Sequence, residues 1–393
     1  MAVNKLDITM MEDVGTSANQ LLQRDGSGNM PAVNASQVSG LSEFTTSTSD
    51  PAIDTNPSGG VGSLWYNKTG GEMYICTDAT AGENVWTNVG EGTGDIQFFQ
   101  GGGSNFGYVV GGYPAQPLGA NLIQKYSYAS DGNAVDAGQD MNYTGGEAGY
   151  CSSTTYGYVM IRHSSAFSSV GTITKYQFNT SNDMTTVGSL STGSTQRNQC
   201  VGTMSSTYGY CMGGGEPTEI DVVDKWIFSS DGNASDVGNL TQSRRYGAGT
   251  CSTTHGYYAG GHSAPPYWDI IDKFPFASDT NSTDVGNLLV AHGYMNTGAQ
   301  SITYGYCCGG NPGGNVIEKW SYASDGNSTD VGDLLDSVNS TSCTSSTNYG
   351  YRNGGSPPPY SDRIDKWSFT TDGNATDVGN MNGACGSTLG GQY

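Results

Sequence analysis

The chain has 393 residues, a formal net charge of −21 and only 13% charged residues. An acidic surface of this kind repels nucleic acid, so we expect no nucleic-acid partner. Gly-rich chains of low hydrophobicity can be disordered, but 25 Tyr, 10 Phe and 6 Trp supply large apolar groups to bury. The composition therefore predicts an ordered, β-rich protein.

The first 45 residues lack helical periodicity and contain no apolar run long enough for a signal peptide. Sec-dependent export is therefore not expected, and no later segment has the apolar length of a membrane span, so we expect no membrane insertion. Residues 21–33 place two short extended runs around the turn-rich stretch Asp-Gly-Ser-Gly, which predicts a β-hairpin. Residues 15–41 resemble a module common near the start of tailed-bacteriophage fibre proteins. A flexible Gly/Ser leader is the alternative.

The next two segments predict a linker and a small β-module. Residues 46–60 are polar and broken by prolines, which cannot donate to a sheet ladder, and this favours a linker. Residues 61–93 predict three strands, the first two joined by the turn at residues 67–71, and they too resemble small β-modules of phage fibres. Because such a meander has little core of its own, we expect residues 1–92 to form a homotrimer or to dock on another virion protein.

From residue 94 onward, one sequence pattern occurs six times. Its central lysines lie 46 to 50 residues apart, at Lys125, Lys175, Lys225, Lys273, Lys319 and Lys366. An aromatic-Gly-Tyr triplet keeps step with them, beginning at Phe106, Tyr156, Tyr208, His255 (with His in the aromatic place), Tyr304 and Tyr349. A fixed period of about 50 residues is typical of propeller blades.

Each repeat contains four short extended runs separated by turn residues, as a blade requires. Strand alternation puts Trp226 and Phe228 on one face of the third run, where they can fill the space between stacked blades. Gly-Gly pairs end most of the second runs, and together these features resemble the kelch-type β-propeller. Residues 383–389 look like one more first run, which we expect to pair with the blade containing residues 106–112 and close the ring. The predicted fold is all-β: a six-bladed kelch-like β-propeller over residues 94–393, preceded by small N-terminal β-modules at 1–45 and 61–93.

The residues that could bind a metal form no convincing site. The nine cysteines lack metal-ligand spacing, and Cys151, Cys251 and Cys343 recur at similar repeat positions, which favours small residues packed in an inner strand over disulfides. The four histidines fall at different repeat phases. The recurrent Asp-Gly-Asn-x-x-Asp could gather oxygen ligands for Ca²⁺, but the needs of a tight turn explain it more simply. We therefore expect no metal and no cofactor.

Ligand-binding candidates lie in the loops between the second and third runs, which vary in length and content on a constant scaffold. Residues 262–268 and 356–361 are the two most distinctive of these loops. Proline limits their entropy, and Tyr267, Trp268 and Tyr360, with His262 beside them, offer aromatic faces for a sugar ring. An ordinary structural loop is the alternative for each. The sequence contains neither a Gly-x-Ser-x-Gly elbow nor a phosphate loop, so no catalytic residue is assigned.

The resemblance to phage fibres implies a non-enzymatic fibre or spike protein on the virion surface, assembled in the host cytoplasm. Its N-terminal region would attach to other virion structural proteins, on the tail or on the head, and the propeller would face a host-surface glycan. Two alternatives stay open. One is a structural decoration protein without a ligand, and the other is a polysaccharide-degrading propeller enzyme.

Overall fold

The computed structural model describes residues 44–89, 105–113, 121–141, 148–161, 171–191, 197–215, 218–263, 266–295, 297–312, 314–357 and 359–392. The chain divides into two compact units between Phe98 and Phe99. All regular structure within these ranges is β-strand, which confirms the predicted all-β class. No described segment forms a helix long and apolar enough to cross a membrane. The hairpin predicted at residues 21–33 lies outside the described residues.

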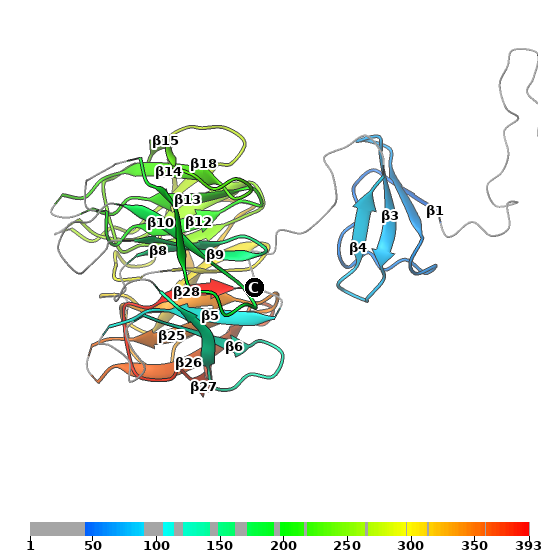
Figure 1. Cartoon of the computed structure of the whole chain (residues 1–393). Coiled ribbons are helices and arrows are strands. Elements are labelled where there is room, and N and C mark those ends of the chain that lie inside the picture. The colour runs from blue at the N-terminus through cyan, green and yellow to red at the C-terminus, as the bar shows by residue number, and fades with distance from the viewer. Residues whose placement is uncertain are drawn as a thin grey trace, which may run out of the picture. The chain divides into compact units, whose positions relative to one another are not determined.

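The smaller unit contains a sheet of four strands, one more than predicted (Figure 1). The strands follow chain order: β1 (Phe44–Ser47), β2 (Leu64–Asn67), β3 (Glu72–Asp78) and β4 (Val85–Asn88). The additional strand β1 runs parallel to β2. Tyr74, Cys76 and Trp86 form a small buried cluster on this sheet.

The prediction of a linker at residues 46–60 is wrong, because this segment belongs to the small sheet unit. Long-range hydrogen bonds hold it there: Trp65 Nε1 donates to the carbonyl of Ser49 (2.9 Å), and Asn67 Nδ2 donates to Asp50 Oδ1 (2.7 Å). Asn84 Nδ2 likewise donates to the carbonyl of Ile53 (2.7 Å). Side chains from distant strands thus supply the partners that a proline-broken backbone cannot find in a ladder.

The larger unit is a β-propeller built from four-stranded antiparallel sheets, which we call blades, and the predicted propeller fold is confirmed (Figure 1). Its described residues contain six such sheets. Blade 1 contains β5 (Phe106–Val110), β6 (Leu122–Ser127), β7 (Val135–Asp140) and β28 (Leu389–Gln392); blade 2 contains β8 (Gly149–Ser152), β9 (Tyr156–Ile161), β10 (Thr172–Gln177) and β11 (Thr185–Ser189); blade 3 contains β12 (Val201–Met204), β13 (Tyr208–Met212), β14 (Val222–Ile227) and β15 (Ser235–Asn239); blade 4 contains β16 (Ala248–Cys251), β17 (His255–Ala259), β18 (Ile270–Pro275) and β19 (Thr283–Asn287); blade 5 contains β20 (Ala299–Gln300), β21 (Tyr304–Cys308), β22 (Val316–Ser321) and β23 (Thr329–Asp333); and blade 6 contains β24 (Ser342–Ser345), β25 (Tyr349–Gly355), β26 (Ser361–Ser368) and β27 (Thr376–Asn380).

The C-terminal strand β28 pairs with β5, so the last part of the chain completes the first blade. The register places Leu389 opposite Val110 and Gln392 opposite Gly107. The predicted partner blade is therefore correct. The strand itself is shifted, because it was predicted at residues 383–389 and β28 begins only at Leu389. Residues before it form a connection in which Ser387 has a φ of +53°, a conformation that a strand does not tolerate.

Aromatic side chains fill the space between blades, as the alternation predicts. The tyrosine that ends each aromatic-Gly-Tyr triplet lies against the last aromatic residue of the next blade's third run. These pairs, with ring centroids 4.7 to 5.1 Å apart, are Tyr108–Phe178, Tyr158–Phe228, Tyr210–Phe276, Tyr257–Tyr322, Tyr306–Phe369 and Tyr351–Tyr128. The final pair joins blade 6 to blade 1. The glycine of the triplet leaves room for an aromatic ring on the neighbouring strand, because a Cβ on Gly209 would lie 2.3 Å from Trp226.

The Asp-Gly-Asn turns, and the Asp-Thr-Asn turn that begins at Asp279, also join neighbouring blades. The first Asp of a turn pairs with the central lysine of the preceding blade, with N···O distances of 2.5 to 2.9 Å, in Lys175–Asp231, Lys225–Asp279, Lys273–Asp325, Lys319–Asp372 and Lys366–Asp131. The Asn accepts a backbone hydrogen bond from that same blade, as Asn233 Oδ1 does from Ser189 N (3.1 Å). The final Asp accepts from the amide two residues on, as Asp236 does from Gly238 (3.1 Å). These contacts account for the repeated carboxylates as turn and inter-blade partners.

All nine cysteines lie in described residues, and each is buried and free. Cys151, Cys251 and Cys343 are in β8, β16 and β24, the first strands of their blades. The interpretation as small residues packed in inner strands is therefore confirmed, and the disulfide alternative is not realised.

Candidate functional site

One end of the propeller is formed by two kinds of loop, those joining second to third strands and those joining one blade to the next. Backbone hydrogen bonds connect the two kinds, from Gly214 N to the carbonyl of Arg244 and from Gly261 N to the carbonyl of His292, both at 2.9 Å. We call this end the loop face. The turns joining first to second and third to fourth strands form the opposite end, which we call the turn face.

An aromatic cluster lies on the loop face where blades 4 and 5 meet. It consists of Tyr246, His262, Tyr267 and Tyr294, and we refer to these four residues as the aromatic cluster. The His262 ring stacks on Tyr246 (centroids 5.3 Å apart) and lies 4.9 Å from Tyr294 and 5.6 Å from Tyr267. Tyr246 and His262 are buried, whereas Tyr267 and Tyr294 are half-buried and present part of their surface to solvent. The buried pair therefore forms a base under two accessible rings.

The backbone places Tyr246 and Tyr294 in the cluster through an uncommon conformation. Both have a φ of +60°, which is rare for a bulky residue. Gln199, Ser340 and Ser387 have φ values of +51° to +57° at the same place in the other inter-blade connections. The conformation is thus a property of the connection, and blades 4 and 5 use it to present a tyrosine.

Polar groups border the aromatic cluster. Asn311 Nδ2 donates to the Tyr267 hydroxyl (2.9 Å). The Arg245 guanidinium lies 5.7 Å from the centre of the Tyr246 ring, pairs with Glu219 Oε1 (3.2 Å) and donates to Gln199 Oε1 (2.6 Å). Amide, hydroxyl and guanidinium groups next to aromatic faces are the components of a site for a polar ligand with an apolar face.

His262 contributes its ring face to the cluster in the neutral form. Burial lowers the pKa of its imidazole, and the nearby Arg245 charge lowers it further. Its Nε2 is buried and accepts or donates no hydrogen bond among the described residues. His262 therefore acts as a flat packing surface under Tyr267 and Tyr294.

The structure brings together two of the four residues proposed from sequence. His262 and Tyr267 belong to the aromatic cluster, while Trp268 turns back to its own loop, where its Nε1 donates to Ser263 Oγ (3.2 Å). Tyr360 lies two blades away in the loop before β26, and no ring contact within the described residues joins it to the cluster. Sequence reasoning missed Tyr246 and Tyr294 because it considered only one of the two kinds of loop. The alternating direction of four strands per repeat, which places the inter-blade loops at the same end as the loops between second and third strands, is the signal that could have found them.

The axis of the propeller holds a recess lined by inner strands of the blades. Its described lining is Tyr150, Cys151, Ser152, Gly202, Thr203, Met204, Gly249, Thr297, Gly298, Gln300, Cys343, Gly390 and Gln392. Hydrogen bonds between blades cross this region, including Gln300 N to Ser345 Oγ (2.8 Å) and Ser345 N to Gln392 Oε1 (3.0 Å). The lining offers hydroxyl and amide groups but no carboxylate, imidazole or amine, so it contains no carboxylate pair of the kind a glycosidase uses.

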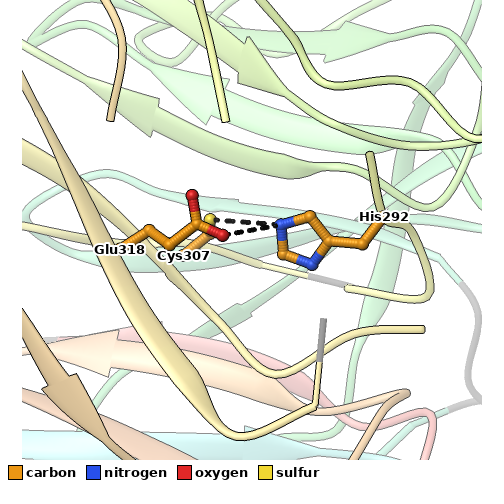
Figure 2. Close-up of side chains that lie close together, drawn as sticks. All are labelled: His292, Cys307 and Glu318. Atoms are coloured by element: carbon orange, nitrogen blue, oxygen red, sulfur yellow. Dashed lines mark hydrogen bonds and ion pairs between the residues drawn. The ribbon is translucent and has the colours of Figure 1, made fainter. Parts of the chain in front are cut away.

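Buried charged pairs recur behind the loop face. A carboxylate on the third strand meets an arginine in three blades, as Asp224–Arg197, Asp272–Arg244 and Asp365–Arg352, with N···O distances of 2.5 to 2.8 Å and fully buried side chains. Blade 5 differs: Glu318 Oε1 lies 3.3 Å from His292 Nε2, and Cys307 Sγ lies 4.0 Å from the same nitrogen (Figure 2). These three atoms all lie within 4.8 Å of one another, and this is the described group that could hold a metal ion.

Comparisons with known proteins identify the class of fold. No protein-family model and no curated protein matches the chain. Among solved structures, the chain is similar to YjhT, a β-propeller, with a TM-score of 0.51 and 10% sequence identity over 62% of this chain and 86% of that chain. At this identity the likeness shows the fold alone.

Proposed function

We propose that this chain is a fibre or spike protein of a tailed-bacteriophage virion whose loop face binds a carbohydrate on the host surface. The aromatic cluster is the basis of the binding part of this proposal, because it has two accessible tyrosine rings, the Asn311 amide bonded to Tyr267 and the Arg245 guanidinium beside Tyr246. A sugar ring presents C–H groups to an aromatic face and hydroxyls to such polar neighbours. The attachment part is supported by the resemblance of residues 15–41 and of the small sheet unit to phage fibre modules. Head and tail fibres are equally compatible with it.

A single cluster would bind weakly. Aromatic packing contributes roughly 0.5 to 1.5 kcal/mol per ring beyond area burial, and ordering a flexible ligand opposes it. Several copies acting together would raise the overall affinity without any new contact. The proposal therefore includes a homotrimer held through residues 1–92, so that three loop faces meet one cell surface.

The test is binding of the purified full chain to host cells and to host polysaccharide. Replacing Tyr267 and Tyr294 together by Ala removes both accessible rings, and we expect binding to fall at least about tenfold, equivalent to about 1.4 kcal/mol. Tyr113→Ala is the matched control, because Tyr113 is an exposed tyrosine after β5 that lies outside the cluster. Thermal stability of each variant is measured alongside.

Three outcomes separate the alternatives. Equal binding by the wild type and the double variant would exclude the aromatic cluster as the site. Failure of the wild type to bind any host fraction would favour a decoration protein without a ligand. Release of reducing ends from the polysaccharide would contradict the non-enzymatic part of the proposal.

A further inference from the structure

We propose that blade 5 holds a buried Zn²⁺ ion coordinated by His292 Nε2, Cys307 Sγ and Glu318 Oε1 (Figure 2). The nitrogen–oxygen separation of 3.3 Å suits a single small cation, whereas the sulfur, 4.0 Å from the nitrogen in a set whose atoms all lie within 4.8 Å of one another, would move closer on binding. Tetrahedral zinc with bonds of about 2.0 to 2.3 Å requires ligand atoms about 3.3 to 3.7 Å apart. Imidazole, thiolate and carboxylate together are a ligand set that zinc accepts.

The imidazole is already oriented as a ligand. His292 Nδ1 lies 2.9 Å from the carbonyl oxygen of Gly309. A carbonyl only accepts, so Nδ1 carries the hydrogen, and in the neutral ring the Nε2 lone pair points toward Glu318 and Cys307. A metal-bound histidine characteristically donates its other ring N–H in this way.

The carboxylate is oriented as well. Glu318 Oε2 accepts from the backbone amide of Leu289 (2.8 Å) and from the Ser328 hydroxyl (2.6 Å), which leaves Oε1 facing the imidazole. With Nδ1 as the ring donor, Nε2 and Glu318 Oε1 are two acceptors only 3.3 Å apart, and a cation bound between them would satisfy both.

Blade 3 shows which group occupies the place of the proposed cation. In blade 3, Arg197 Nε donates to the carbonyl of Gly213 (2.8 Å), just as His292 Nδ1 does to Gly309, and the guanidinium reaches on to Asp224. The imidazole is shorter and ends before that point. Blade 3 also has a cysteine at this place. Cys211 lies opposite Asp224 on the neighbouring strand, as Cys307 lies opposite Glu318 in blade 5. Two exchanges, histidine for arginine and glutamate for aspartate, thus distinguish blade 5 from blade 3, whereas the cysteine is common to both. A bound cation would supply the charge that the arginine carries in blade 3.

The charges of the proposed site balance in a dry interior. Cys307 would bind zinc as a thiolate, so its thiol must lose a proton when the metal binds. Binding displaces that proton to solvent, and one Zn²⁺ then neutralises one thiolate and one carboxylate. The fourth tetrahedral position is left to a water molecule.

The experiment uses the full chain, expressed with zinc supplementation, and a second sample refolded without metal and then given Co²⁺. We expect one zinc ion per purified chain by elemental analysis, and the near-ultraviolet charge-transfer absorption of a cobalt-thiolate bond in the refolded sample. The melting temperature of the refolded protein should rise on addition of Zn²⁺.

Two variants make the result specific. His292→Arg combined with Glu318→Asp installs the arrangement of blade 3, and we expect a folded protein with no zinc and no zinc-dependent melting shift. Cys211→Ser removes the equivalent cysteine beside an arginine, and it should keep the full zinc content. Wild-type protein that contains no zinc and shows no cobalt-thiolate absorption would overturn the proposal, leaving a protonated His292–Glu318 pair. Undiminished zinc in Cys307→Ser would overturn it as well.

Discussion

The two ends of the propeller differ in how closely their contacts repeat from blade to blade. On the turn face, Lys–Asp pairs recur between successive blades with nearly the same geometry. On the loop face, the inter-blade connections share one backbone conformation but carry different side chains, Gln199, Tyr246, Tyr294, Ser340 and Ser387. The difference shows that the repeated contacts hold the blades together. Positions whose side chains vary between blades can instead acquire a ligand-binding role.

The largest expected effect comes from opening the ring. Removing residues 389–393 leaves the β5 edge without its partner β28, and we expect the free energy of unfolding to fall by more than about 4 kcal/mol. Denaturant unfolding followed by circular dichroism measures this. Leu389→Ala alone should cost about 2 to 5 kcal/mol because the side chain is fully buried. Leu335→Ala, at an exposed leucine, is the matched control, and an equal loss in both variants would show that closure adds little.

The buried arginine pairs should show the next largest effect. Asp272→Ala leaves the guanidinium of Arg244 buried without its charged partner, and we expect a loss of about 3 to 5 kcal/mol. The double variant Arg244→Met/Asp272→Leu should recover most of that loss, because it removes both charges. A single variant as stable as the wild type would mean that the pair is dispensable for blade 4.

Glu318 should give the protein an acid-sensitive step. Its folded pKa lies below the usual 4.5, so its stabilising contribution is present above pH 4.5 and is lost as the pH falls through the folded pKa. Unfolding of wild type and Glu318→Gln is compared from neutral to acidic pH. The loss of stability below pH 4.5 should be shallower in the variant, and parallel curves would assign the acid sensitivity to other carboxylates.

The smallest effect is expected from a single Lys–Asp pair on the turn face. Lys225→Met removes one such pair, whose lysine and aspartate side chains are 19% and 52% exposed, and we expect a loss of no more than about 1 kcal/mol. The difference from wild type should shrink at high ionic strength, because salt screens exposed charges. A salt-independent loss would indicate that the contact of Lys225 Nζ with the Tyr208 ring, 4.8 Å from its centre, contributes more than the ion pair.

The blades could be predicted from local sequence patterns. The triplets, the third-run aromatics and the turns are short-range signals, so strand type and the faces of Trp226 and Phe228 followed from alternation. The same short range explains the error at residues 46–60. Their hydrogen-bond partners Asn67 and Asn84 lie 17 and 31 residues from Asp50 and Ile53, beyond the reach of any local rule.

The sequence by itself determined the repeat, its strand periodicity and a loop containing His262 and Tyr267. Tertiary structure alone decided that Tyr246 and Tyr294 contact that loop, because the stacking of successive blades sets which connections lie side by side. It also decided the grouping of His292, Cys307 and Glu318: antiparallel pairing puts Cys307 opposite Glu318, and the inter-blade connection brings His292 beside them. Chain spacing encodes which strands form, but only the register between strands and the stacking of blades decide which side chains meet.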